Sequence, residues 1–97
     1  MSILHLIRSS AFHRSDFEQC LSIAQSNDTI IFCDDGCYNL SHPLTTNLLA
    51  QENKLTIKVL QDHAQARAII APQTIEGITM EDLVSLTFTH DKVITWQ

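Results

Sequence analysis

A short apolar run that ends abruptly in a turn constrains the fold more than any other feature of this chain. Residues 30–33 are apolar without interruption, and Asp-Asp-Gly follows at residues 34–36. An unbroken apolar run is typical of a strand covered on both faces, as in a parallel sheet. The next residues predict a tight turn, because Gly36 can adopt a positive φ and aspartates bond nearby backbone amides. In open α/β sheets, functional sites lie beyond the carboxyl ends of such strands.

Strand-like and helix-like patterns alternate along the rest of the chain. Further strands are predicted at residues 2–7, 55–60 and 93–96, and a short one that Pro72 interrupts begins at residue 69. Helices are predicted at residues 14–26, from Pro43, at residues 61–68 and from Thr79. This alternation indicates an α/β fold: one small three-layer domain over residues 1–97, with a mainly parallel sheet flanked by helices.

The first and last helices each carry apolar side chains at helical spacing. In the first helix, one face holds Phe17, Cys20, Leu21 and Ala24. At the last helix, a threonine followed three residues later by an aspartate matches a variant of the capping box, which marks where the helix begins. We expect the inward face of that helix to bury Met80, Leu83, Val84 and Leu86.

The composition excludes several classes of protein. The chain has 97 residues and a net charge of −5, and its six lysines and arginines are scattered with no basic stripe. Autonomous nucleic-acid binding is therefore not expected, because counterion release needs clustered cations. No run approaches the roughly 18 consecutive apolar residues of a membrane helix, and the first residues lack the charged start of a signal peptide. Three cysteines, few and odd in number, indicate a reducing cytoplasm.

The five histidines do not form a metal-binding pattern. None pairs with another at i, i+4, and there is no tight cluster of cysteine and histidine, so we expect isolated surface or capping histidines and neither a metal nor a cofactor. Asp34 and Asp35 could bind a cation, but adjacent acids before a glycine more often form a turn. No phosphate loop, nucleophile elbow or catalytic carboxylate pair is visible, which argues against an independent enzyme.

The three thiols remain as candidates for chemistry. Cys33 belongs to the apolar run and is expected to be a small core residue. Cys37 follows the turn and is the better thiol candidate of the two, but Asp34 and Asp35 would raise its pKa. Cys20 lies on the apolar face of the first predicted helix, so burial is its default interpretation. A functional role for Cys20 would need that face to border a cleft or a subunit boundary.

The beginning and middle of the chain resemble the TusB/DsrH family of sulfur-relay subunits. Ile-Leu-His-Leu at residues 3–6, followed by Arg-Ser at residues 8–9, is similar to the opening of the family, although Ser10 replaces a usual proline. Asp-Gly at residues 35–36, after an aliphatic strand, is similar to the family's Asp-Gly turn.

The second half of the chain continues this resemblance. Residues 60–62 and then Ala-Arg at residues 66–67 are similar to the segment that leads to the family's Arg-Gly, with Ala68 in place of the glycine. The closing segment is the most specific match, because residues 82–87, His90 and Trp96 follow the family's Val-x-Leu-Thr, His and terminal Trp pattern. The similar segments span nearly the whole chain, in order.

The resemblance implies a DsrE/F/H-like fold and a hetero-oligomer with related TusC/TusD-like (DsrF/DsrE-like) subunits. It further implies a persulfide relay in the cytoplasm, most directly one that serves 2-thiouridine formation at the tRNA wobble position. The alternatives are a DsrH-type subunit of dissimilatory sulfur oxidation, or a structural or regulatory partner whose thiols are inert. In each case the chain is expected to be an accessory subunit of a sulfurtransferase complex, without direct contact to nucleic acid or membrane.

The same resemblance makes Cys20 the candidate persulfide carrier. The sulfur-oxidation branch of the family carries a cysteine on its first helix, whereas Cys33 and Cys37 fall where the family has aliphatic residues. A persulfide carrier needs an accessible thiol of low pKa. A position in the middle of a helix lacks the help of a helix terminus, so activation would come from a cation such as Arg8 or Arg14, or from a partner chain.

Overall fold

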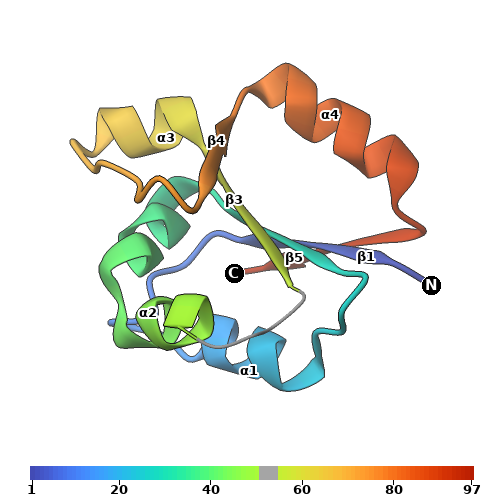
Figure 1. Cartoon of the computed structure of the whole chain (residues 1–97), viewed down its shortest axis with the longest axis horizontal. Helices are drawn as coiled ribbons and strands as arrows, with labels where there is room; N and C mark the ends of the chain where they lie inside the picture. The colour runs from blue at the N-terminus through green and yellow to red at the C-terminus, as the bar shows by residue number, and fades with distance from the viewer. Residues whose placement is uncertain (51–54) are drawn as a thin grey trace.

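The computed structural model describes residues 1–50 and 55–97, and Figure 1 shows their arrangement. The described strands are β1 (Ile3–Ile7), β2 (Thr29–Phe32), β3 (Thr56–Leu60), β4 (Glu76–Ile78) and β5 (Lys92–Trp96). The described helices are α1 (Asp16–Ile23), the 3-10 helix η1 (Asp34–Ser41), α2 (Pro43–Ala50), α3 (Gln61–Ala66) and α4 (Met80–Thr89). The strands form a single five-stranded sheet in the order β4-β3-β2-β1-β5, and every neighbouring pair is parallel.

Helices cover both faces of the sheet and make the three predicted layers. One face packs against α1, α2 and η1 in a core that includes Phe17 and Phe32, whose rings meet edge to face. The opposite face packs against α4, where Ile31 and Leu83 belong to a second core cluster. In Figure 1, α1 and α2 lie below the sheet and α4 lies above it. β2 is the middle strand and is buried throughout, which confirms the prediction from its unbroken apolar run.

Parallel pairing brings the carboxyl ends of three strands to one edge of the sheet. Ile7 at the end of β1 pairs with Phe32 of β2 on one side and with Trp96 of β5 on the other. The hydrogen bonds continue one residue further: the N–H of Arg8 donates to the Trp96 carbonyl, and the N–H of Cys33 donates to the Ile7 carbonyl, each at 3.0 Å. The residues after these strands therefore leave the sheet side by side, at what we term the carboxyl edge.

The turn predicted after β2 is the start of the longer helix η1. Gly36 does not adopt a positive φ, contrary to the prediction, and the residue that does is Asp34, with a φ of 49°. Aspartate is among the residue types that enter this left-handed region most readily. Gly36 is required for a different reason, because a Cβ at this position would overlap the backbone carbonyl of Ile7. The constraint on this glycine is close contact with β1.

The segment between α3 and α4 also differs from its prediction. In the described part of the chain no strand forms at residues 69–71, and the short strand β4 lies further on at the sheet edge. Ala68 follows α3 with a φ of 54°, and its N–H and that of Ile69 bond back to carbonyls of α3, as in a Schellman motif. The chain therefore turns at the point where the apolar residues suggested that it would extend.

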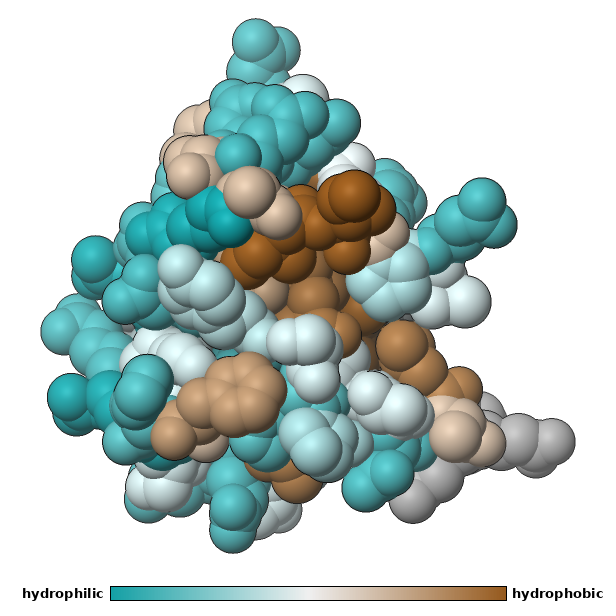
Figure 2. All heavy atoms as spheres, turned by 90° about the vertical axis from the view of Figure 1, so that its left-hand side faces the viewer, coloured by the Kyte–Doolittle hydropathy of each residue, from teal (hydrophilic) through white to brown (hydrophobic). Residues whose placement is uncertain are grey.

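The same segment forms an apolar hollow beside β4. A cavity of about 430 Å³ is lined in part by Val59, Ile69, Ile75 and Gly77, and Ile70, which also lines it, is 94% exposed. Figure 2 faces this side of the molecule and shows apolar residues gathered among polar ones. The apolar residues that did not form a strand thus line a surface hollow.

Helix α4 begins where predicted but buries less than predicted. Thr79 and Asp82 form the capping box, with hydrogen bonds of 3.1 Å in both directions. Leu83 is buried, whereas Met80 and Val84 are 52% and 50% exposed, so their predicted burial was wrong. The reason is that α4 lies on the sheet without a neighbouring helix in its core cluster, which encloses only a narrow stripe of it. None of the described helices has both the length and the apolar character needed to cross a membrane.

Candidate functional site

Two ion pairs cross the carboxyl edge. Arg8, the first residue after β1, donates from Nε to Oδ2 of Asp34 at 2.8 Å. Arg67, directly after α3, donates from Nε and Nη2 to Oδ1 of Asp35, each at 3.2 Å. These pairs join β1 and α3 to the first turn of η1. Both lie at the surface, since the Asp34 and Asp35 side chains are 39% and 64% exposed.

His63 of α3 supports the same turn. Its Nδ1 accepts a hydrogen bond of 2.9 Å from the backbone N–H of Asp34. The hydrogen bond from Arg8 is the largest influence on the Asp34 carboxyl, and together with nearby positive charge it outweighs partial burial, so the pKa of Asp34 lies below its ordinary value. Asp34 and Asp35 thus bind Arg8 and Arg67 and help to fix the first turn of η1. The described residues contain no group of three or more His, Cys, Asp or Glu side chains that could hold a metal ion.

Cys33 precedes this turn and Cys37 follows it, and both are buried, with 5% and 0% of their surface exposed. Cys33 belongs to the core against α4 and Cys37 to the core against α1 and α2, so the two thiols lie on opposite faces of the sheet. Burial raises the pKa of each thiol to about 11, and the negative charge of Asp34 adds to the effect. The core role of Cys33 and the raised pKa of Cys37 are confirmed, but Cys37 has no access to solvent.

Cys20, the candidate persulfide carrier, is buried on the inner face of α1. Its exposed fraction is 0%. Burial, and then the negative charge of Asp28, raises the pKa of its thiol to about 12. Arg8 and Arg14, the cations that could have activated it, each bind a surface aspartate instead. In the chain by itself the Cys20 thiol is neither exposed nor activated, and its role as a sulfur carrier stays a prediction.

His5 is fully buried, so the expectation of surface or capping histidines was wrong for this residue. Its Nε2 lies 2.9 Å from Oδ2 of Asp28, and the indole N–H of Trp96 donates to its Nδ1 at 3.1 Å. Because an indole N–H can only donate, Nδ1 accepts, and the proton on Nε2 is donated to Asp28. The available signal was period two, which places His5 on the same strand face as Ile7. Its partners could not be inferred, since they lie 23 and 91 residues away in the sequence.

Three of the six lysines and arginines meet at the carboxyl edge, although the sequence suggested that they were scattered. They line one cavity of about 360 Å³, which we term the edge pocket. Its lining residues are Arg8, Ser9, Ser10, His13, Arg14, Asp34, Asp35, Arg67 and Gln97. The convergence follows from the fold, because parallel strands deliver distant parts of the chain to the same edge.

Comparison with solved structures places the fold among small α/β proteins. The crystal structure of the ychN protein from E. coli matches with a TM-score of 0.75 and 18% identity, over 99% of this chain and 100% of that one. The solution NMR structure of protein Tm0979 from Thermotoga maritima matches with a TM-score of 0.62 and 18% identity, over 92% of this chain and 93% of that one. At this level of identity the likeness shows the fold alone.

Comparison of sequences identifies the family. No curated protein matches this chain. A family model described as "DsrH like protein" matches residues 9–93, which include the carboxyl-edge turn, all three cysteines and the capped helix α4. With this model matching well over half of its length, the chain belongs to the DsrH-like family.

Proposed function

We propose that this chain is an accessory subunit of a sulfur-relay complex, one that organises sulfur transfer while a related subunit carries the reactive thiol. Membership of the DsrH-like family supports a sulfur-relay subunit. The observation that carries the accessory role is the burial of all three free cysteines. A relay step requires a thiolate that can reach the outer sulfur of a donor persulfide. Thiols with pKa values of about 11 to 12 in the core are almost wholly protonated at neutral pH.

The exposed face of α4 supports a chain that works in an assembly. Met80, Val84 and Phe88 recur at four-residue spacing along this helix and are 52%, 50% and 84% exposed. Apolar side chains in such an array commonly mark a protein–protein interface. We propose that TusC/TusD-like (DsrF/DsrE-like) subunits are the partners and that the complex works in the cytoplasm, where free thiols persist.

Association can be tested by co-expressing the chain with the related small subunits encoded near it and measuring the mass of the purified species. We expect a stable larger assembly at micromolar concentration. Phe88→Ser should weaken it without changing the free energy of unfolding. Ile70→Ser is the matched control, because Ile70 is also highly exposed but lies beside the apolar hollow. A chain that stays monomeric with every such partner would contradict the proposal.

The role of the thiols can be tested by intact-mass spectrometry after incubation with a persulfidated donor protein. For the isolated chain we expect no added sulfur atom, because the three thiols are buried. A donor-dependent adduct that disappears only in Cys20→Ser would show that Cys20 is a carrier after all, which would require α1 to move. Cys33→Ser and Cys37→Ser serve as the controls.

A more specific proposal concerns the cellular process in which the complex takes part. We propose 2-thiouridine formation at the tRNA wobble position, to which the TusB side of the resemblance points. The position of Cys20 on α1 favours the second candidate, a DsrH-type subunit of dissimilatory sulfur oxidation. Deleting the gene should lower the 2-thiouridine content of bulk tRNA under the first proposal. Unchanged 2-thiouridine together with impaired oxidation of stored sulfur would favour the second.

A further inference from the structure

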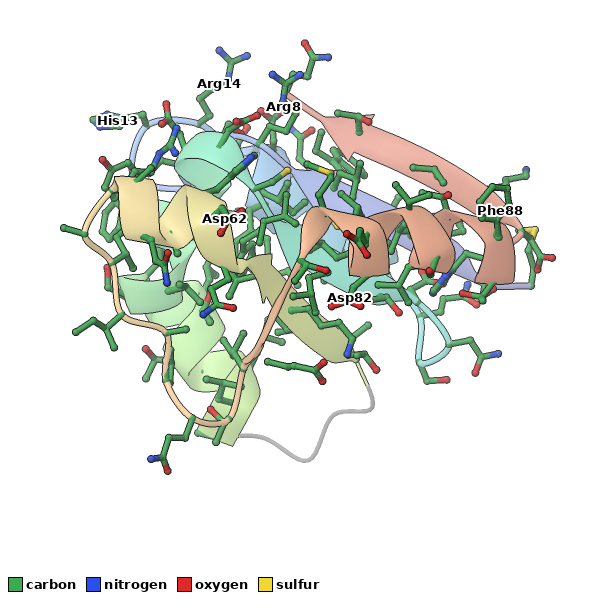
Figure 3. All side chains as sticks on the ribbon, turned by 90° about the horizontal axis from the view of Figure 1, so that it is seen from above. Arg8, His13, Arg14, Asp62, Asp82 and Phe88 are labelled. Carbon is green, nitrogen blue, oxygen red and sulfur yellow. The ribbon has the colours of Figure 1, made fainter. Side chains whose placement is uncertain are left out.

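The edge pocket gathers arginines in an acidic protein, and each of them is paired with an aspartate. Three arginines and two aspartates line it, whereas the whole chain carries a net charge of −5. Arg8 and Arg14 come from the segment between β1 and α1, and Figure 3 shows both side chains projecting from the same end of the molecule. The fold therefore concentrates guanidinium groups where functional sites of parallel sheets commonly lie.

The aspartates orient the arginines and leave most of their donors unused. Arg8 binds Asp34 through Nε at 2.8 Å, and Arg14 binds Asp16 through Nε at 3.3 Å. A guanidinium group has five N–H donors, and the terminal nitrogens of both arginines have no acceptor within residues 1–50 and 55–97. Each carboxylate binds the Nε side of a guanidinium group and restricts the conformation of the arginine side chain. The terminal nitrogens are then held in position to bind a ligand. Because the acids are occupied in this way, the pocket does not suit a cation.

Two backbone amides beside these arginines also lack an acceptor. Ser9 and Ser10 line the pocket and are 8% and 7% exposed. Neither backbone N–H donates a hydrogen bond to any acceptor within residues 1–50 and 55–97. A backbone amide without a protein partner bonds to water or to a bound ligand. A bound acceptor in the pocket would satisfy them.

We propose that the edge pocket binds a small tetrahedral oxyanion, with Arg8 and Arg14 as the main ligands and the Ser9 and Ser10 amides as further donors. Phosphate and the sulfur oxyanions share this chemistry. Arginine forks bind such oxygens with charge-assisted, bidentate hydrogen bonds, and successive backbone amides form anion-binding nests. A cavity of about 360 Å³ has room for the anion and a small organic body attached to it. The site is a property of the isolated chain and does not depend on the sulfur-relay proposal.

The test is a titration of the isotope-labelled full chain, followed by the amide signals of residues 8–14 and the side-chain signals of the arginines. Sodium phosphate and sodium thiosulfate are the two probes, added separately while chloride keeps the ionic strength constant. We expect saturable shifts confined to the edge pocket. Arg14→Gln should weaken binding at least about tenfold, the scale of one lost charge-assisted hydrogen bond. Arg14 suits this substitution because its side chain is 64% exposed, so the fold should not suffer.

Lys58→Gln is the matched control. It also removes a cation from a surface ion pair, the 3.1 Å contact with Glu76, but it lies outside the edge pocket. Binding should be unchanged in this variant. Tighter binding of thiosulfate than of phosphate would identify a sulfur oxyanion as the ligand, and similar binding would support the broader class of tetrahedral anions.

Four results would overturn the proposal. Shifts that grow linearly without saturation would show only ionic screening. An affinity unaffected by Arg14→Gln would place the anion elsewhere, and an equal loss in Lys58→Gln would show a nonspecific charge effect. Binding of tRNA under conditions where neither small anion binds would also reject the site as a small-anion pocket.

Discussion

Two carboxylate clusters in this protein use similar residue types in opposite surroundings. Asp28, only 2% exposed, accepts hydrogen bonds of 2.9 to 3.0 Å from His5 and from the backbone N–H groups of Ile3 and Gln25. At the carboxyl edge, the exposed Asp34 and Asp35 bind Arg8 and Arg67, whose side chains are 48% and 25% exposed. In the buried cluster, both ring nitrogens of His5 and both carboxylate oxygens of Asp28 are bonded within the protein. In the exposed cluster, the terminal nitrogens of Arg8 have no acceptor among the described residues. The difference separates a polar network that stabilises the protein from one available to a ligand.

The buried cluster joins the two ends of the chain. His5 lies on β1, Asp28 directly precedes β2, and Trp96 ends β5. Burial alone would raise the pKa of Asp28, but the hydrogen bonds from His5, Gln25 and Ile3 together outweigh it, and the pKa lies below its ordinary value. Asp28 is therefore ionised and satisfied in the core, and the cluster fixes the relative positions of three strands.

The largest expected effect on stability comes from a change in η1, the helix that carries the exposed aspartates. Gly36→Ala should destabilise the protein by more than about 3 kcal/mol or prevent folding, because the new Cβ overlaps the Ile7 carbonyl and the backbone must shift. Gly77→Ala is the control, since its Cβ would come no nearer than 3.5 Å to any neighbour, the Gln61 side chain. Urea unfolding measures both variants. Equal stability of the two would show that η1 does not depend on contact with β1.

The next effect tests the comparison directly. Asp28→Ala leaves a buried histidine N–H and two amides unpaired, so we expect a loss of about 3 kcal/mol in the free energy of unfolding. Asp35→Ala removes an exposed partner of Arg67 and should cost less than about 1 kcal/mol. Comparable losses in the two variants would mean that the clusters do not differ as described.

Acid titration should separate the clusters further. A carboxyl whose folded pKa is lowered stabilises the protein above its unfolded pKa, about 3.9 for aspartate, and this stability is lost as the pH falls through the folded value. Asp28 and Asp34 both have lowered pKa values, but Asp34 is more exposed and its contribution is screened. The free energy of unfolding should therefore fall in acid by a smaller amount in Asp28→Asn than in Asp34→Asn. The opposite order would assign the acid sensitivity to the carboxyl edge.

The smallest expected effect is a stabilisation near the exposed cluster. Ala68 has a φ of 54° just after α3, where glycine carries no penalty. Ala68→Gly should raise the free energy of unfolding by about 1 kcal/mol, the cost of a left-handed alanine. Thermal unfolding at neutral pH, with Ala66→Gly inside α3 as a destabilising control, would measure it. A loss of stability in Ala68→Gly would contradict the Schellman assignment.

Patterns among residues close in the sequence were sufficient to predict much of the fold. The apolar run at residues 30–33 predicted the middle strand, and Thr79 with Asp82 predicted the start of α4. The helical spacing of Phe17 and Cys20 predicted the buried face of α1. Each of these features depends on local hydrogen bonds or on one-sided burial, which spacing in the sequence reflects directly.

The amino-acid sequence by itself determined the α/β class, the order of strands and helices, and the low reactivity expected of cysteines on apolar faces. Only the tertiary structure decided that Met80 is exposed, that Gly36 must lack a side chain, and that His5 finds Asp28 and Trp96. The scattered arginines likewise became a pocket only when parallel strands aligned their ends. The physical reason is the same in each case. These properties depend on which distant segments pack together, and the spacing of residues within one helix or strand does not indicate which other segments will pack against it.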